Sequence, residues 1–169
     1  LDADMAQLVE KHMRDVGVKV LTSTRVESIQ GNADGKIDHV ITTKGHYAAD
    51  LVLLSVGVRP KVELAKKAGL LIGPSGGIHV NEYMQTIDAD IYAAGDCAEK
   101  SCNIRGTGCF LPLGSVANKE GRVAGSNAVG HVERFPGVMA ATALKVFDWN
   151  VGRAGLSVEQ AQELGVPVV

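Results

Sequence analysis

The feature that most constrains this chain is a short apolar run that ends in glycine and aspartate, within T-I-D-A-D-I-Y-A-A-G-D-C at residues 86–97. Small apolar residues at 91–94 predict a short strand buried on both faces of a parallel sheet. Gly95 would let a ligand approach the backbone closely, and Asp96 would lie past the carboxyl end of the strand, where open α/β sheets bind ligands. An ionised carboxylate only accepts hydrogen bonds, so Asp96 suits the hydroxyl groups of a polyol or ribose. The alternative is a strand followed by an Asp N-cap or an Asx-turn.

Size and charge limit the classes of partner. The chain has 169 residues and a net charge of −2, which fits one ordinary domain or pieces of two. Near-neutral charge gives no electrostatic footprint for nucleic acid, and no apolar run reaches the length of a membrane span. No signal peptide is visible, and three cysteines, an odd number, do not make a disulfide framework. We therefore expect no nucleic-acid or membrane partner and a reducing, cytoplasmic setting.

The pattern of apolar residues predicts alternating helices and strands. The amphipathic spacing before Gly17 predicts a first helix, with His12 on its apolar face as a packing residue rather than a metal ligand. Polar turns and glycines separate the later segments, with a turn signal at 32–35. Ser157 and Gln160 form a capping-box signature, and 168–169 favour the start of another strand. Strands are expected at 18–20, 25–30, 37–43, 51–56, 78–80 and 143–151, and helices at 2–16, 62–68, 115–129 and 157–164, with Cys102 and Cys109 in a loop.

Several blocks, taken in order, resemble the pyridine nucleotide–disulfide oxidoreductases, a family of FAD enzymes. The sequences of these blocks most resemble the branch that contains NADH oxidase, NADH peroxidase and coenzyme A–disulfide reductase. The similarity covers essentially the whole chain. The matching blocks are L-V-L-L-S-V-G-V-R-P at 51–60, the glycine–aspartate block at 86–97, L-P-L-G-S-V-A-N-K-E-G-R-V-A-G-S-N-A-V-G at 111–130 and A-L-K-V-F-D-W-N-V-G-R-A-G-L at 143–156.

The resemblance implies an α/β fold made of the second portions of two Rossmann-like domains. It places the end of an NAD(P)H-binding domain at 1–60, the second segment of an FAD-binding domain at 61–132, and the start of an α+β C-terminal dimerisation domain at 133–169. It also implies FAD as cofactor, NAD(P)H as co-substrate, and a small-molecule or thiol/disulfide substrate. The expected reaction is reduction of a disulfide, peroxide or oxygen by a homodimer.

The same resemblance assigns roles to individual residues. It implies that Asp96, beside Gly95, binds the ribityl chain of FAD. It also implies that the helix starting near Leu113, Gly114 and Ser115 has its N-terminus directed at the flavin ring. A helix N-terminus offers unpaired N–H groups and partial positive charge, which would stabilise the negative charge of reduced flavin. The alternative is an ordinary helix start with Ser115 as N-cap.

Gly57 follows the apolar run 51–56 and would let the nicotinamide dinucleotide lie close to the backbone; a plain turn glycine before Pro60 is equally compatible. The G-x-G-x-x-G fingerprints for both pyrophosphates are absent from these residues, as is the upstream redox cysteine of the family. We therefore expect a fragment of a longer flavoenzyme, inactive alone, with no catalytic residue in this chain.

Three other features of the sequence support different interpretations. Cys97 and Cys102 have the C-x-x-x-x-C spacing of some redox disulfides in the family, which we interpret as coincidence, and with Cys109 they do not have zinc-ligand spacing. Phe147, Trp149 and Val151 alternate, and predict one apolar strand face that favours self-association. The remaining alternatives are a non-catalytic association module and a fragment of a rubredoxin- or ferredoxin-reductase-like flavoprotein.

Overall fold

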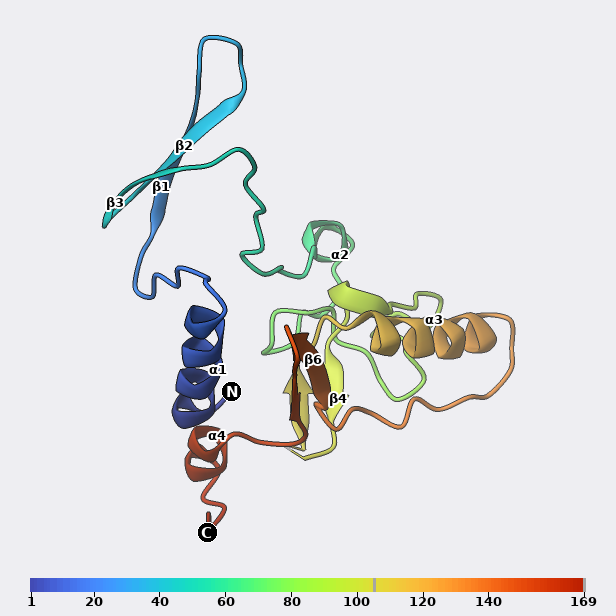
Figure 1. The fold of residues 1–169 in the computed structure, drawn as a ribbon. Coiled ribbons are helices and arrows are strands. Elements are labelled where there is room, and N and C mark those ends of the chain that lie inside the picture. The colour runs from blue at the N-terminus through green and yellow to red at the C-terminus, as the bar shows by residue number, and fades with distance from the viewer. Residues whose placement is uncertain (105, 169) are drawn as a thin grey trace. The chain divides into compact units, whose positions relative to one another are not determined.

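The computed structural model describes residues 1–104 and 106–168, which form two compact units. One unit contains residues 4–57, and the other contains residues 1–3 together with those from 58 onward. Figure 1 shows the order of the elements along the chain. Because the structure does not fix how the units sit relative to each other, each is described by itself.

Residues 4–57 form a helix and an antiparallel meander. Helix α1, Ala3–Asp15, is followed by Gly17 in the left-handed region, at φ +95°, as the sequence predicts. Three strands then pair in the order β1-β2-β3, and the Asn32 side chain accepts the backbone N–H groups of Asp34 and Lys36 in the first turn. The strands are β1 Val26–Gly31, β2 Ile37–Thr42 and β3 Gly45–Ala48.

Two strands expected in this unit are wrong. Residues 18–20 and 51–56 are not strands, and the second segment leaves its apolar side chains in solvent, with Leu53 at 83% and Val56 at 91% exposed. A strand needs neighbours that take its backbone N–H and C=O groups, and the described residues pair none with 51–56. The apolar run therefore stays extended and unpaired.

Turns rather than strands build the segment that leads to the glycine–aspartate block. Helix α2, Glu63–Lys67, ends before Gly69, close to the expected bounds. The strands expected at 78–80 and 91–94 are wrong, because only isolated bridges form there, from Ile78 and from Tyr92. Within the described residues every sheet is antiparallel, and parallel pairing is limited to isolated bridges. The expected parallel sheet is therefore not formed here.

A hairpin and a long helix close the core of this unit. Strands β4 Lys100–Cys102 and β5 Thr107–Cys109 pair where a loop was expected, so the cysteines lie on strands. Helix α3 spans Gly114–Ala128, within a residue of the predicted bounds. The main apolar cluster beneath it consists of Met84, Ala98, Cys102, Val123, Ala124, Phe135 and Val138.

The last segment is a hairpin and a short helix. Strands β6, Thr142–Val146, and β7, Trp149–Arg153, replace the single strand expected at 143–151. Phe147 lies in the turn between them at φ +55°, so the predicted face of Phe147, Trp149 and Val151 is wrong, and Val151 is buried. Helix α4, Val158–Glu163, begins with the predicted capping box of Ser157 and Gln160.

The expected strand start at 168–169 includes Val169, which lies outside the described residues; residue 168 is in no strand. No helix among residues 1–104 and 106–168 is long and apolar enough to cross a membrane. The mixture of helices and sheets fits the α/β class that the sequence predicts.

Candidate functional site

The glycine–aspartate block forms a tight turn. The chain is extended at Ala94, at φ −149°, and then enters the 3-10 turn η1, Gly95–Cys97. Gly95 has φ +83°, a backbone conformation that side chains disfavour, whereas a Cβ there would only touch Ala117 Cβ at 3.7 Å. Backbone conformation therefore requires this glycine, and Asp96 follows it at an exposed position.

Helix α3 starts without a side-chain cap. Leu113 is its N-cap residue, and its carbonyl accepts the first intrahelical bond, from Val116 N–H at 2.9 Å. The Leu113 N–H donates to the Leu111 carbonyl at 2.9 Å. The N–H groups of Gly114 and Ser115 precede the first intrahelical bond, so they are the donors that this helix end offers. Ser115 lies inside the helix, and the alternative that it is the N-cap is wrong.

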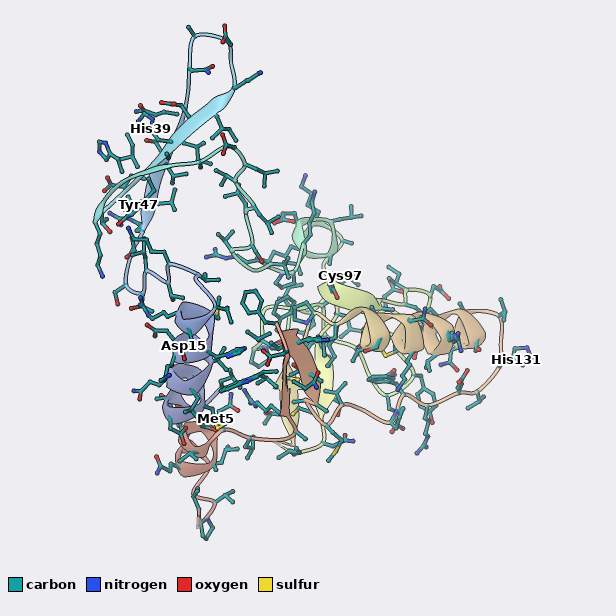
Figure 2. All side chains as sticks on the ribbon, viewed as in Figure 1. Met5, Asp15, His39, Tyr47, Cys97 and His131 are labelled. Carbon is teal, nitrogen blue, oxygen red and sulfur yellow. The ribbon has the colours of Figure 1, made fainter. Side chains whose placement is uncertain are left out.

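A direct hydrogen bond joins the η1 turn to α3. The Gly95 N–H donates to Glu120 Oε2 at 2.7 Å. In Figure 2, Cys97 marks η1 at the end of α3 that lies opposite His131, which follows the helix. The structure thus brings the predicted residues Gly95 and Asp96 to the N-terminal end of α3, where Leu113, Gly114 and Ser115 lie.

Gly57, the remaining predicted residue, belongs to the other unit. It has φ +81°, and apart from its chain neighbours no atom of the described residues lies within 4 Å of a Cβ placed there. The backbone conformation alone therefore explains a glycine at position 57, as at a turn.

Two charged residues that sequence reasoning missed hold the η1 turn. The side chains of Lys100 and Glu120 are completely buried, with Lys100 Nζ 3.4 Å from Glu120 Oε2. Lys100 Nζ also donates to the Gly95 carbonyl and, at 3.0 Å, to the Ala98 carbonyl. The pair therefore binds both the N–H and the C=O of Gly95.

A sequence signal for Glu120 does exist. Glu120 lies three residues after Ala117 and four before Ala124, so it occupies the small-residue face that α3 packs inward. A carboxylate on such a face is rarely buried without a partner. Lys100 gives a weaker signal, because a lysine after a turn is usually solvated.

The environment of Glu120 is only partly compensated. Burial raises the pKa of the Glu120 carboxyl, the Gly95 N–H and the Lys100 charge oppose this, and the nearby Asp96 charge adds to the rise. The contacts with Gly95 N–H and Lys100 Nζ both involve Oε2, while Oε1 is buried without a hydrogen-bond partner among the described residues. The carboxylate is therefore only half satisfied by the fold.

A second buried carboxylate, Glu99, is fully engaged. Its Oε2 accepts the Ser75 N–H at 2.9 Å and the Ser75 hydroxyl at 2.7 Å, and its Oε1 lies 3.4 Å from His79 Nδ1. Burial raises the pKa of Glu99, but the contacts with Ser75 and His79 outweigh it and the pKa is lowered. A Cβ on Gly73 or Gly108 would overlap this carboxyl group, so glycines make the space that it occupies.

The cysteines form neither a disulfide nor a metal cluster in the part of the chain that is described. Cys97 and Cys102 carry thiols, and the Cys97 thiol donates to the Ala94 carbonyl at 3.4 Å. No group of three or more His, Cys, Asp or Glu side chains is arranged to hold a metal ion there. Cys97 and Cys102 are not bonded to each other in this structure.

The arrangement fits a ligand with hydroxyl donors on one part and acceptor atoms on another. Asp96 is an exposed acceptor, and the Gly114 and Ser115 N–H groups are donors at a partially positive helix end. Because carboxylates flank the turn, a polyol suits it better than a phosphate. The ribityl chain and ring edge of a flavin have this combination of groups.

Comparison with known proteins gives a consistent result. The sequence pattern of the pyridine nucleotide-disulphide oxidoreductases matches residues 1–124. The CoA-dependent NAD(P)H sulfur oxidoreductase of Pyrococcus furiosus is 39% identical over 99% of this chain, and an NADH oxidase of Methanocaldococcus jannaschii is 40% identical over 100%. The chain spans 37% of the length of each of these relatives.

Solved structures agree with the sequence matches. An NAD-dependent persulfide reductase from A. fulgidus superposes with a TM-score of 0.87 and 47% identity, over 98% of this chain and 30% of that one. A water-forming NADH oxidase from Lactobacillus brevis gives 0.85 and 30% identity, over 98% and 36%. The match over residues 1–124 covers well over half of the sequence, and the chain belongs to the pyridine nucleotide-disulphide oxidoreductase family.

Proposed function

We propose that this chain is a segment of a longer FAD-dependent, NAD(P)H-driven oxidoreductase that reduces a disulfide, a peroxide or oxygen. The observation that carries the proposal is the η1 turn with Asp96, held against the uncapped start of α3. Bound FAD would accept hydride from NAD(P)H and pass electrons onward. The chain's own residues would bind and orient that flavin.

Each predicted flavin contact has a defined task. The Asp96 carboxylate accepts a hydrogen bond from a ribityl hydroxyl, and exposure leaves it accessible. The Gly114 and Ser115 N–H groups point their partial positive charge at acceptor atoms of the flavin ring. Leu113 contributes through its backbone at the helix start. No residue of this chain takes the role of the redox cysteine in the proposal.

The domain boundaries and assembly are part of the same proposal. Residues 1–60 end an NAD(P)H-binding domain, with Gly57 beside the nicotinamide; 61–132 complete the FAD-binding domain; and 133–169 begin a dimerisation domain. The enzyme is a homodimer in the cytoplasm, acts on a small-molecule or thiol/disulfide substrate, and uses neither nucleic acid nor membrane as a partner. The Cys97 and Cys102 thiols support a reducing compartment.

The alternatives have weaker support. A ferredoxin reductase from Rhodopseudomonas palustris superposes with a TM-score of 0.76 but only 23% identity, which shows the shared fold alone. The persulfide reductase and NADH oxidase structures are more similar on both measures. A non-catalytic association module would not need an open carboxylate beside a free helix start.

The test is the colour and chemistry of the full-length gene product, with its intact mass determined first. We expect a protein longer than 169 residues that shows the visible spectrum of an oxidised flavin, bleached by NADH or NADPH under anaerobic conditions. Residues 1–169 alone should show no oxidase, peroxidase or disulfide reductase turnover. A colourless full-length protein that binds no added FAD would contradict the proposal.

A further inference from the structure

A completely buried ion pair lies behind the η1 turn. Lys100 Nζ and Glu120 Oε2 are 3.4 Å apart, and both side chains have no exposed surface. Replacing a buried ion pair by apolar residues of similar size is often neutral or stabilising, so stability alone explains such a pair poorly. The role of this ion pair is better explained by the groups that its charges hold in place.

The contacts of the pair converge on one peptide segment. Glu120 accepts the Gly95 N–H at 2.7 Å, and Lys100 donates to the carbonyls of Gly95 and Ala98, which flank Asp96. Gly95 also has the left-handed φ of +83°, which its neighbours must maintain. The backbone on both sides of Asp96 is thereby fixed by side chains from two other elements, β4 and α3.

Charge adds a second constraint. Asp96 and Glu120 interact as like charges, and Lys100 is the cation that lies between Glu120 and the turn carbonyls. Loss of Lys100 would leave a buried carboxylate uncompensated close to Asp96. Such a site favours the protonated form of the Glu120 carboxyl, which is a weaker acceptor for the Gly95 N–H.

We propose that Lys100 and Glu120 are positioning residues of the flavin site. Through Gly95 they hold the Asp96 carboxylate at a fixed distance from the α3 N-terminus. The Asp96 carboxylate and the N–H groups at the start of α3 can then bind the same flavin. The inference rests on the proposed function, because it assigns a task toward the flavin. It goes further by naming the residues that set the site's geometry without touching the ligand themselves.

The experiment measures the dissociation constant for FAD and the melting temperature of the apoprotein, in the full-length protein. The variants are Lys100→Met, Glu120→Leu, the double variant Lys100→Met/Glu120→Leu, and Glu120→Gln. Lys119→Met is the matched control, since Lys119 is an exposed lysine next to Glu120 on α3.

We expect each single apolar variant to raise the FAD dissociation constant at least tenfold. The double variant removes both charges, so its melting temperature should recover toward wild type while its dissociation constant stays at least tenfold raised. Glu120→Gln keeps an acceptor for Gly95 N–H and should rescue most of the affinity. Lys119→Met should match wild type.

A double variant that folds and binds FAD with wild-type affinity would overturn the inference, as would folded single variants with unchanged affinity. Glu120→Gln as weak as Glu120→Leu would also contradict the role of the Gly95 contact. If the wild-type protein itself does not bind FAD, the proposed function fails, and that result is distinct from all of these.

Discussion

Glu99 and Glu120 are two buried carboxylates of the unit that runs from residue 58 onward. They are buried to nearly the same extent, but their pKa values shift in opposite directions. Glu99 is 6% exposed and Glu120 is 0% exposed. Ser75 and His79 contact both oxygens of Glu99, and its pKa is lowered. Among the described residues, hydrogen-bond contacts reach only Oε2 of Glu120, and burial raises the pKa of its carboxyl.

The difference separates a carboxylate that completes the fold from one that serves a site. Glu99 accepts hydrogen bonds from Ser75 in the glycine-rich turn, and a Cβ on Gly73 or Gly108 would overlap its carboxyl group. Glu120 needs a buried cation and still leaves one oxygen without a partner among the described residues. Burial alone therefore does not reveal a carboxylate's role; the account of its hydrogen-bond partners does.

The largest effect should come from removing the cation beside Glu120. Lys100→Met leaves a buried carboxylate without its partner, and breaking a buried pair in this way typically costs about 3–5 kcal/mol of unfolding free energy. Urea unfolding of the flavin-free full-length protein measures it, with Lys119→Met as the exposed control. A loss as small as that of the control would mean that Glu120 is not held as an ion, which breaks the comparison.

A smaller loss should follow from filling the space around Glu99. Gly108→Ala places a Cβ where the Glu99 carboxyl lies, and overpacking of this kind costs about 1–3 kcal/mol. The matched change beside the other carboxylate is Gly121→Ala on α3, where a Cβ meets no atom within 4 Å. That helix variant should gain about 0.5–1 kcal/mol, because alanine favours helix over glycine. Equal unfolding free energies for the two variants would contradict the described packing.

The smallest and most specific effect concerns pH. Because the pKa of Glu99 lies below its ordinary 4.5, its stabilising contribution is complete above that pH and is lost as pH falls through the folded-state pKa. Because the pKa of Glu120 lies above 4.5, stability is greatest below that pH and declines as pH rises through the folded-state pKa. Each pKa unit corresponds to about 1.4 kcal/mol.

Melting temperatures of wild type, Glu99→Gln and Glu120→Gln from acid to neutral pH measure these slopes. The advantage of wild type over Glu99→Gln should grow with rising pH, and its advantage over Glu120→Gln should shrink. Glu133→Gln, which changes an exposed carboxylate of the same unit, is the control. Slopes of the same sign for Glu99 and Glu120 would remove the distinction between them.

The sequence predicted local structure well wherever local chemistry decides it. Helices α1, α3 and α4 were located by apolar spacing and by glycine or capping signals, and the Asn32 turn by its side chain. The strands predicted at 51–56 and 91–94 were wrong, because strand formation depends on neighbouring strands, which a pattern of apolar residues does not reveal. The 143–151 hairpin was missed because no glycine or asparagine marks its turn at Phe147 and Asp148.

The sequence indicates the residues of the candidate site that have one task each, and their contact with flavin stays a prediction. Asp96 and the α3 start follow from the motif and from helix physics. Lys100 and Glu120 were missed because their role is a pairing across twenty residues of sequence, which only the fold brings together. The space that Gly108 leaves for Glu99 was invisible for the same reason.

The most direct test of the account is FAD affinity in the full-length protein after Asp96→Ala. Loss of a hydrogen bond to a charged acceptor typically costs about 1.5–3 kcal/mol, or roughly a 10- to 150-fold rise in the dissociation constant. Asp90→Ala, an exposed aspartate of the same block, is the control and should leave affinity unchanged. An Asp96→Ala protein that binds FAD as tightly as wild type would contradict the assignment of this turn to the flavin.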